Sequence, residues 1–347
     1  MKRHLLFLAA LLIVNLAASA QKKFSVYAVG FYNQENLFDT CHDEGKKDYE
    51  YLPNKGWNGM KYTNKLRNMS KALADMGTDV LPNVGCAFIG LSEVENHKVL
   101  DALVDQAPLK ARNMKYVHIE GPDRRGIDCA LLYNPSLFSV KNVKLLPYVQ
   151  ELAKDSAFFT RGFLTVRGEM AGDDVAVIVC HWPSRFSGPF YRESAARQVK
   201  VIKDSLLNVN QEMKIFVMGD MNDDPVNKSM QVYLQAKPEI SQVGAGDMYN
   251  PWYNVLAKEG KGTLFYSGNW NLFDQIVITP NLLNKDAKKK DYSSLKYWKS
   301  HIFRRDYLIQ QEGQYKGAPL RTTAGGRWLN GYSDHLPVVM YLVKEKK

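Results

Sequence analysis

The chain has 347 residues, of which 45% are hydrophobic and 24% charged, and it carries a net charge of +10. This composition excludes a disordered chain, and four cysteines are too few for a secreted fold held together by disulfides. The excess of Lys and Arg favours an anionic partner, such as a nucleic acid or a phosphorylated substrate.

The first twenty residues predict a signal peptide. Two basic residues precede an apolar run of signal-peptide length, and Ala18-Ser19-Ala20 follows as a small-x-small cleavage pattern. The run is too short for a membrane-spanning helix, and no second apolar stretch of membrane length follows it. We therefore expect a protein that is exported to the periplasm or beyond the cell, with one domain over residues 21–347 and no obligate protein partner.

Apolar periodicity then predicts strands dispersed among helices. An alternating stretch over residues 24–38 predicts a first strand, and helical spacing from Tyr62 to Met76 predicts a helix that Gly77 ends. A second amphipathic helix is predicted around residues 199–206. Short apolar runs predict further strands at "CAFIGLSEV", "CALLYN", "FLTVRGEM", "VAVIVCHW", "KIFVMGDM", "FDQIVIT" and "LPVVMYLV". This order indicates a single α/β domain.

The cysteines are interpreted mainly as small core residues. Cys86, Cys129 and Cys180 lie in apolar, strand-like runs, and Cys41 does not. One disulfide remains open as an alternative.

Polar side chains follow several of these predicted strands. In "VMGDMNDDP", Asp220 and Asn222 are two residues apart and would share a face of an extended chain. A carboxylate beside an amide suits a phosphate oxygen and an attacking water, whereas the plain alternative is an Asx-rich turn. In "FIGLSEVENH", Glu93 follows an uncharged apolar strand and needs a partner, either a hard cation such as Mg²⁺ or a salt bridge.

The first strand offers a similar pair. Asn33 and Glu35, in "FYNQENLFD", are also two residues apart, which predicts that both side chains point the same way. Glu35 is retained as an additional candidate ligand.

His181 ends a strongly apolar strand in "VIVCHWPSRF", just before a loop that contains Arg185. This position favours a general acid or a phosphate contact over a histidine merely bonded in the core. Asp128, at the start of "DCALLY", is a candidate for orienting His181. Arg161, in "FFTRGFLTV", is placed to reach a phosphate or to form a surface salt bridge.

The stretch "GYSDHLPVVMYLV" places Asp334 and His335 at the start of a buried strand. Neighbours on a regular strand point to opposite faces, so both can serve one site only from an irregular strand entrance. Asp274, at the beginning of "FDQIVIT", is available to orient the imidazole of His335.

Taken in order, seven motifs resemble the endonuclease/exonuclease/phosphatase superfamily, whose fold is that of deoxyribonuclease I. They are "YNQEN", "LSEVEN", "RRGIDCALLY", "CHWPSR", "GDMND", "WNLFDQI" and "SDHLPV", and they run from about Phe31 to Pro337. The resemblance, nearest to secreted bacterial members, implies a four-layer αββα sandwich whose two mixed sheets open at one end into the active site.

The resemblance also implies roles for individual residues. Those expected to hold Mg²⁺, with Mn²⁺ or Ca²⁺ as alternatives, are Asn33, Glu93 and Asp334. Those expected to take part in catalysis are His181, Asp220, Asn222, Asp274 and His335. From their positions in the sequence, and not from the resemblance, Asp128, Arg161, Arg185 and Arg321 are expected to contact substrate. His181 matches the deoxyribonuclease branch and departs from abasic-site endonucleases, which favours general phosphodiester hydrolysis.

A basic and aromatic insertion is predicted at about 281–330. Residues 285–327 contain eleven Lys and Arg against four Asp and Glu, with several Tyr, Trp and Phe between them. Such a segment either binds single-stranded nucleic acid or is a solvated flap whose aromatic rings pack onto the body. In "APLRTTAGGRW", just ahead of the Asp-His pair, either Arg321 or Arg327 is expected to contribute to substrate selection.

The leading hypothesis from sequence is therefore an exported, metal-dependent phosphodiesterase, and most specifically a nuclease. A phosphatase or phosphodiesterase that acts on sugar phosphates, inositol phosphates or phospholipid headgroups would share the same motifs. A catalytically silent binding protein would be expected to have lost Glu93, Asp220, Asp274 or His335, and all four are present.

Overall fold

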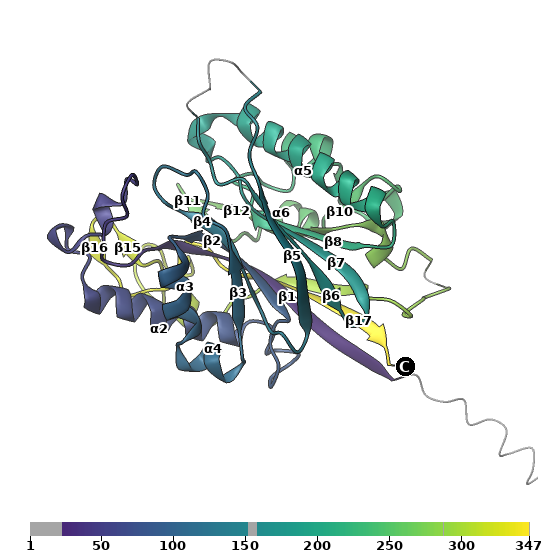
Figure 1. Ribbon diagram of the computed structural model, residues 1–347, viewed down its shortest axis with the longest axis horizontal. Helices are drawn as coiled ribbons and strands as arrows, with labels where there is room; N and C mark the ends of the chain where they lie inside the picture. Colours follow the sequence, from purple (N-terminus) through teal and green to yellow (C-terminus); the bar gives the residue numbers. More distant parts are fainter. Residues whose placement is uncertain (1–22, 152–157, 287, 347) are drawn as a thin grey trace, which may run out of the picture.

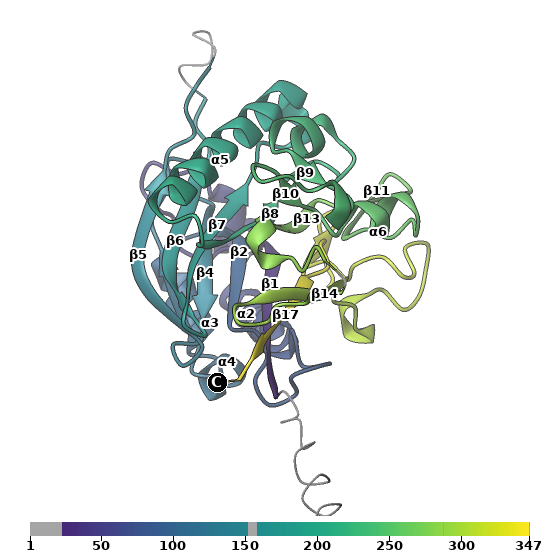
Figure 2. The ribbon, with the colours of Figure 1, turned by 90° about the vertical axis from the view of Figure 1, so that its right-hand side faces the viewer.

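The computed structural model describes residues 23–151, 158–286 and 288–346, so the expected signal peptide lies outside the described residues. Within these ranges, two large mixed sheets of six and seven strands pack face to face, and helices cover their outer faces (Figure 1, Figure 2). The four-layer α/β sandwich predicted from the sequence is confirmed.

The first sheet is built around the N-terminal strand, which pairs with the C-terminal strand on one side. Phe24 lies opposite Glu345 and Phe31 opposite Val338, so the two ends of the described chain are adjacent. In spatial order the strands are β14 (Lys296–Ile302), β17 (Val338–Glu345), β1 (Phe24–Leu37), β2 (Phe88–Val94), β4 (Asp128–Tyr133) and β3 (Lys115–His118).

The second sheet contains a parallel pair of strands at its centre, β7 and β8. In spatial order its strands are β5 (Phe138–Leu146), β6 (Phe163–Met170), β7 (Asp173–His181), β8 (Lys214–Asp220), β13 (Asp274–Ile278), β10 (Met248–Tyr249) and β9 (Ala236–Lys237). Two small hairpins stand apart from both sheets, β11 (Leu264–Tyr266) with β12 (Asn269–Asn271) and β15 (Thr323–Ala324) with β16 (Arg327–Trp328).

Helices flank both sheets. The first sheet is accompanied by α2 (Gly59–Asp75), α3 (His97–Val104) and α4 (Ala107–Ala111), whereas α5 (Pro189–Val209) covers the second sheet and α6 (Tyr253–Ala257) is short (Figure 1). The Asn58 side chain caps the start of α2 by accepting from the Lys61 amide, and Gly77 follows its end with a positive φ. Both helices predicted by periodicity are confirmed.

The central strands are buried on both faces, which explains their nearly continuous apolar sequences. Between the sheets, Phe31 and Phe88 pack with Phe216 and Met218, and all four side chains are fully buried. Separate clusters join the first sheet to α2, α3 and α4, and the second sheet to α5. Burying apolar surface in three layers gives the strand ends a rigid support.

Two substantial strands, β5 and β14, were not predicted. Both lie at sheet edges, where fewer residues are buried, so their sequences lack a continuous apolar run. The disulfide left open by the sequence is absent, because all four cysteines lie in the described residues and are free. Cys86, Cys129 and Cys180 are buried core residues, as predicted.

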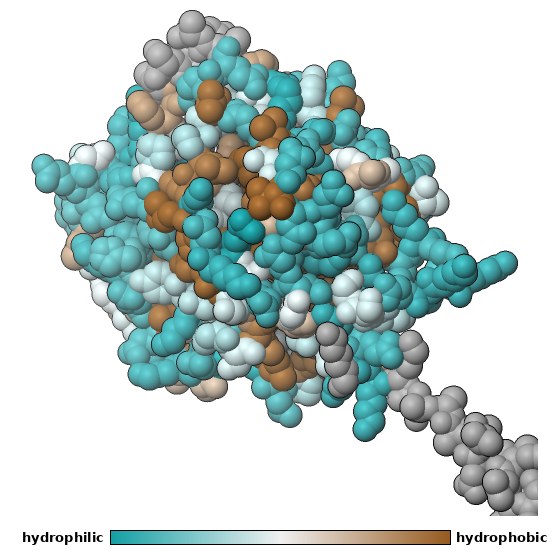
Figure 3. All heavy atoms as spheres, turned by 45° about the vertical axis from the view of Figure 1, so that its right-hand side comes forward, coloured by the Kyte–Doolittle hydropathy of each residue, from teal (hydrophilic) through white to brown (hydrophobic). Residues whose placement is uncertain are grey.

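Every helix in the described ranges is too short or too polar to cross a bilayer. Figure 3 shows a face covered mainly by hydrophilic side chains, with hydrophobic groups in small areas between them.

Candidate active site

Three neighbouring strands of the second sheet carry functional residues that lie side by side at one level of the sheet, which we call the rung. His181, the last residue of β7, pairs with Asp220, the last residue of β8. Asp274, the first residue of β13, pairs with Asp220 from the other side. Because β13 runs antiparallel to β8, its beginning meets the ends of the other two strands. The sheet topology thus brings together residues that lie up to 93 positions apart in sequence.

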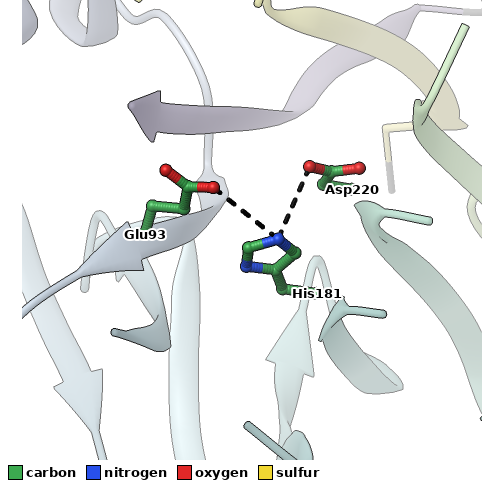
Figure 4. Close-up of side chains that lie close together, drawn as sticks. All are labelled: Glu93, His181 and Asp220. Carbon is green, nitrogen blue, oxygen red and sulfur yellow. Dashed lines mark ion pairs between the residues drawn. The ribbon is translucent and has the colours of Figure 1, made fainter. Parts of the chain in front are cut away.

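Glu93 reaches this rung from the first sheet (Figure 4). Its Oε1 atom lies 3.7 Å from Nε2 of His181, which in turn lies 3.7 Å from Oδ2 of Asp220. One ligand atom from each of these three residues lies within 4.8 Å of the others. Glu93 adopts a positive φ of 59°, an unfavourable backbone conformation for a residue with a Cβ, and such strain is concentrated at functional sites.

His335 and Asp274 form a hydrogen-bonded pair at the opposite side of Asp220. Nδ1 of His335 donates to Oδ2 of Asp274 at 2.7 Å, and Nε2 of His335 lies 3.9 Å from Oδ2 of Asp220. His335 precedes β17 and forms an isolated bridge with Leu264, so the predicted irregular strand entrance is present. The hydroxyl of Ser333 accepts from the His335 amide and donates to the carbonyl of Asn33, which fixes this entrance against β1.

Burial and charge separate the protonation states of the two histidines. Burial alone would lower the pKa of His335, but the charges of Asp274 and Asp220 outweigh it and raise that pKa well above its usual value. Burial lowers the pKa of His181 well below its usual value, and Arg161 acts in the same direction. At neutral pH the site therefore pairs an imidazolium at His335 with a neutral imidazole at His181.

Burial also raises the pKa of Asp220 to about 7; His335 opposes the rise and Asp274 adds to it. Two amide groups fix this carboxylate. Nδ2 of Asn33 donates to Oδ2 at 3.0 Å, and the backbone amide of Asn222 donates to Oδ1 at 2.9 Å. Asp220 is thus a buried, oriented carboxylate that titrates close to neutral pH.

The predicted metal-binding residues are divided between two positions. Glu93 and Asp334 both line the catalytic pocket, a cavity of about 410 Å³ between the two sheets' open ends. Asn33 lies deeper and directs its amide to Asp220. The structure adds His181 and Asp220 to Glu93 as a compact donor set. These residues fit a divalent cation, because closely spaced buried carboxylates repel one another without a positive charge between them, and their oxygens suit Mg²⁺ or Mn²⁺.

Two of the predicted substrate contacts line the pocket or its edge. Arg161 lines the pocket, where it is held by Asp123 at 3.1 Å and by the carbonyl of Trp182. Arg321 lies at the rim, where it bridges Glu35 at 3.3 Å and Asp334 at 3.1 Å.

The other two predicted contacts have structural partners. Nε2 of His118 lies 3.0 Å from Oδ2 of Asp128, so the expected pairing of Asp128 with His181 is wrong. Nδ1 of His181 has no hydrogen-bond partner among the described residues. Arg185 binds the loop after β8 through the carbonyl of Asn222 and the carboxylate of Asp224, and it does not line the pocket.

The expectation that Asn33 and Glu35 point the same way also fails, because β1 is irregular after Asn33. Glu35 and Asn36 have positive φ values of 45° and 56°, and the pairing with β2 shifts register there. The Glu35 carboxylate consequently accepts from the backbone amide of Thr322, whereas Asn33 reaches Asp220.

Sequence reasoning did not single out two cations near the site. Arg125 lines the pocket and lies within the quoted motif "RRGIDCALLY", so a signal for it was present. Lys65 is fully buried and donates to the Thr322 hydroxyl and the Tyr332 carbonyl. Lys65 lies four residues before Met69, on the apolar face of α2, and a lysine at such a position indicates a buried polar contact. The apolar periodicity by itself did not draw attention to it.

Most aromatic rings of the basic insertion pack onto the body, as the flap alternative expects. Phe303 is fully buried, Tyr307 packs on Tyr332, and Trp328 packs on Trp57. Part of the insertion forms β14, an edge strand of the first sheet.

The sandwich and the pocket at its open end together indicate a hydrolase of phosphoric esters. The model of the endonuclease/exonuclease/phosphatase family matches residues 28–344, and the chain belongs to this family. The resemblance noted in the sequence is thereby confirmed. Among curated proteins none matches the chain.

Solved structures share the fold at low sequence identity. A family member from Bacteroides thetaiotaomicron is 14% identical with a TM-score of 0.55, covering 93% of this chain and 97% of its own. The mannosyl-6-phosphatase of the same organism is 13% identical with a TM-score of 0.55, covering 91% and 99%. D. rerio TDP2 complexed with single strand DNA product is 11% identical with a TM-score of 0.53, covering 92% and 99%.

Proposed function

We propose that this phosphoesterase is an exported, divalent-metal-dependent phosphodiesterase whose substrates are nucleic acids. The observation that carries the proposal is the pocket in which the Asp274-supported imidazolium of His335 faces Asp220, with His181, Glu93 and Arg161 around the same space. This arrangement provides a proton acceptor, a proton donor and positive charge within reach of one phosphate.

The protonation states of Asp220 and His335 give these two residues different roles in the reaction. Asp220, with a pKa near 7 and two donors that fix its orientation, is the acceptor for the proton of the attacking water. As the new O–P bond forms and the P–O bond to the leaving oxygen breaks, His335 donates its Nε2 proton to the developing negative charge. Nε2 of His335 lies 3.9 Å from Oδ2 of Asp220, so a small movement of either side chain returns the proton after each turnover.

The remaining groups bind and orient the phosphate. Arg161 is held rigidly by Asp123, and neutral His181 can donate one hydrogen bond to a phosphoryl oxygen. Glu93 and Asp334 would hold the cation at the pocket wall, with Asp220 and His181 beside it. A bound divalent cation would polarise a phosphoryl oxygen and offset the charge that develops in the transition state.

Three observations support a nucleic acid as substrate. The chain has a net charge of +10, of which Lys2 and Arg3 of the signal-peptide pattern contribute two, Arg125 and Arg161 line the catalytic pocket, and a further cavity shares Asp334 with that pocket. TDP2, which shares the fold, has been solved with a single strand DNA product. The proposal of export rests on the signal-peptide pattern of the first twenty residues.

A phosphatase acting on a phosphorylated sugar is the second candidate, since a mannosyl-6-phosphatase has the same fold at a similar TM-score. A panel assay separates the two: single- and double-stranded DNA, RNA, bis(p-nitrophenyl) phosphate and mannose 6-phosphate, each with Mg²⁺, with Mn²⁺ and with chelator. We expect hydrolysis of the diesters with metal and none with chelator. Release of phosphate from the monoester alone would overturn the phosphodiesterase assignment.

A further inference from the structure

A second cavity of about 800 Å³ continues from the catalytic pocket, with Asp334 as a wall of both. Its other walls come from the β11–β12 hairpin and from residues 310–325. We name it the side cleft and define it by Phe265, Tyr266, Tyr315 and Arg321. A third cavity of about 530 Å³ shares Phe265 and Tyr315 with the side cleft, so the three spaces follow one another along the surface.

The strand β11 connects the catalytic pocket to the side cleft. Leu264 lines the catalytic pocket and forms the bridge with His335, and the next two residues, Phe265 and Tyr266, line the side cleft. A substrate chain that extends from the scissile phosphate past Asp334 therefore meets aromatic side chains immediately. The position of these aromatic side chains is tied to the catalytic histidine through the backbone.

The side cleft and the cavity beyond it present aromatic rings and cations together. Tyr266 and Tyr315 are 70% and 52% exposed. In the cavity beyond, Trp270 packs against Phe265, and the Arg304 guanidinium lies 5.9 Å from the Trp270 ring.

Each acidic residue of these walls has a cationic partner, although Asp334 shares Arg321 with Glu35. Glu259 pairs with Lys261 at 2.8 Å, and Asp334 pairs with Arg321 at 3.1 Å. Arg304 and Lys316 line the third cavity next to Tyr315, which both cavities share, and they leave an excess of positive charge there.

Exposed rings beside cations suit unpaired nucleotides, whose bases stack on aromatic faces while the phosphates meet positive charge. The bases of a duplex are stacked on one another and cannot present their faces to Tyr266 or Tyr315. A neutral oligosaccharide would stack on the rings but leave the excess cations without partners. We propose that the side cleft binds unpaired nucleotides flanking the scissile phosphate, which makes the enzyme selective for single strands. This inference rests on the proposed phosphodiesterase function and specifies its substrate.

The test is the Tyr266→Ala/Tyr315→Ala double variant, because both side chains are largely exposed and their removal spares the core. Tyr49→Ala is the matched control, since Tyr49 is 54% exposed and lines none of these cavities. Steady-state rates are measured on a single-stranded oligonucleotide of about eight nucleotides and on bis(p-nitrophenyl) phosphate, a diester that has no flanking nucleotides for the side cleft to bind.

The double variant should raise KM for the oligonucleotide by about tenfold or more, with kcat/KM for the small diester unchanged. An unchanged KM for the oligonucleotide, or an equal loss in Tyr49→Ala, would overturn the inference. Oligonucleotide binding is also measured by fluorescence anisotropy in chelator, where single strands should bind more tightly than the duplex and the double variant should lose that preference. Equal affinity for duplex and single strand would overturn it as well.

The two proposals fail in different ways. If the native protein hydrolyses neither the oligonucleotide nor the small diester with any metal, the phosphodiesterase function is wrong, whatever the anisotropy shows. If the small diester is hydrolysed and the double variant behaves like the native protein on oligonucleotides, only the assignment of the side cleft is wrong.

Discussion

Asp274 holds His335 through a hydrogen bond of 2.7 Å between Oδ2 and Nδ1, with both residues buried. The carboxylate lies at the first position of β13 and the imidazole just before β17, so two different sheets must be correctly stacked for the bond to form. The pair gives the site an imidazolium directed at Asp220, and its removal tests whether that charge matters.

Asp274→Asn should lower kcat by about two to four orders of magnitude, because the amide cannot stabilise the imidazolium or hold its orientation. The measurement is the steady-state rate on bis(p-nitrophenyl) phosphate. Asp48→Asn is the matched control, since Asp48 is also buried and pairs with Nδ1 of His42 in a loop outside the pocket. Comparable losses in both variants would show that the effect is one of folding and not of catalysis.

Metal affinity should rise with pH across the neutral range. Asp220 has a pKa of about 7 and lies beside the cation site, so below that pH the binding of the cation must release its proton, and above it the cation binds without displacing a proton. The apparent Kd for Mn²⁺, measured by calorimetry, should fall by up to about tenfold per pH unit below pH 7 and level off above it. A Kd that is constant from pH 6 to 8 would mean that Asp220 does not lie beside the bound cation.

The raised pKa of Asp220 also makes the stability of the folded protein depend on pH. Because the pKa of Asp220 is raised on folding, the folded protein binds this proton more tightly than the unfolded chain, and stability from this group is lost as pH rises toward 7. A cation would replace the proton. The increase in Tm caused by Mn²⁺ should therefore be larger at pH 8 than at pH 6, and the reverse order would contradict the assignment.

Lys65 should support the site through the loop that it anchors. Its ammonium group donates to Thr322 and to the Tyr332 carbonyl, on either side of the hairpin that follows Arg321. Lys65→Met removes both bonds and leaves only the one that the Thr322 hydroxyl donates to the Tyr332 carbonyl, so we expect a loss of about 1 to 3 kcal/mol in the free energy of unfolding, measured by urea denaturation. We also expect a lower kcat, because Arg321 and Asp334 lose their support.

Lys203→Met is the control for this experiment. Lys203 is equally buried but donates to the Gly246 carbonyl beneath α5, away from the pocket. It should lose a similar amount of stability while its folded fraction retains the native kcat. If Lys65→Met also retains the native kcat, Lys65 has no part in positioning the site.

Gly331 should tolerate no side chain. A Cβ at this position would lie 2.2 Å from the carbonyl oxygens of both Leu320 and Arg321, where the chain passes close to its own hairpin before reaching His335. Gly331→Ala should cost about 1 to 3 kcal/mol in the free energy of unfolding. Gly59→Ala, where a Cβ would meet nothing within 4 Å, should leave stability nearly unchanged. A neutral Gly331→Ala would mean that this loop is packed less tightly.

The sequence predicted the buried parts of this fold well because burial on both faces leaves a strong apolar signal. The runs that became β7, β8 and β13 were recognised, and so were the polar groups that end or begin them. It could not predict β14, whose alternating and charged sequence reflects an edge position that only the partner strand β17 defines.

Local rules also misplaced individual side chains. The period of two that suits an extended strand failed after Asn33, where two left-handed residues redirect Glu35 toward Thr322. The pairing of Asp128 with His181 failed because β3, a strand not predicted, supplies His118 instead. The first error comes from a backbone irregularity and the second from a strand pairing, and the apolar pattern shows neither.

The most direct test of the account is the initial rate of bis(p-nitrophenyl) phosphate hydrolysis by the native protein and by His335→Ala, each in Mn²⁺ and in chelator. The account predicts turnover by the native protein with metal, near-background rates in chelator, and a loss of about two to four orders of magnitude in kcat for His335→Ala. Undiminished hydrolysis in chelator, or native turnover in His335→Ala, would contradict it.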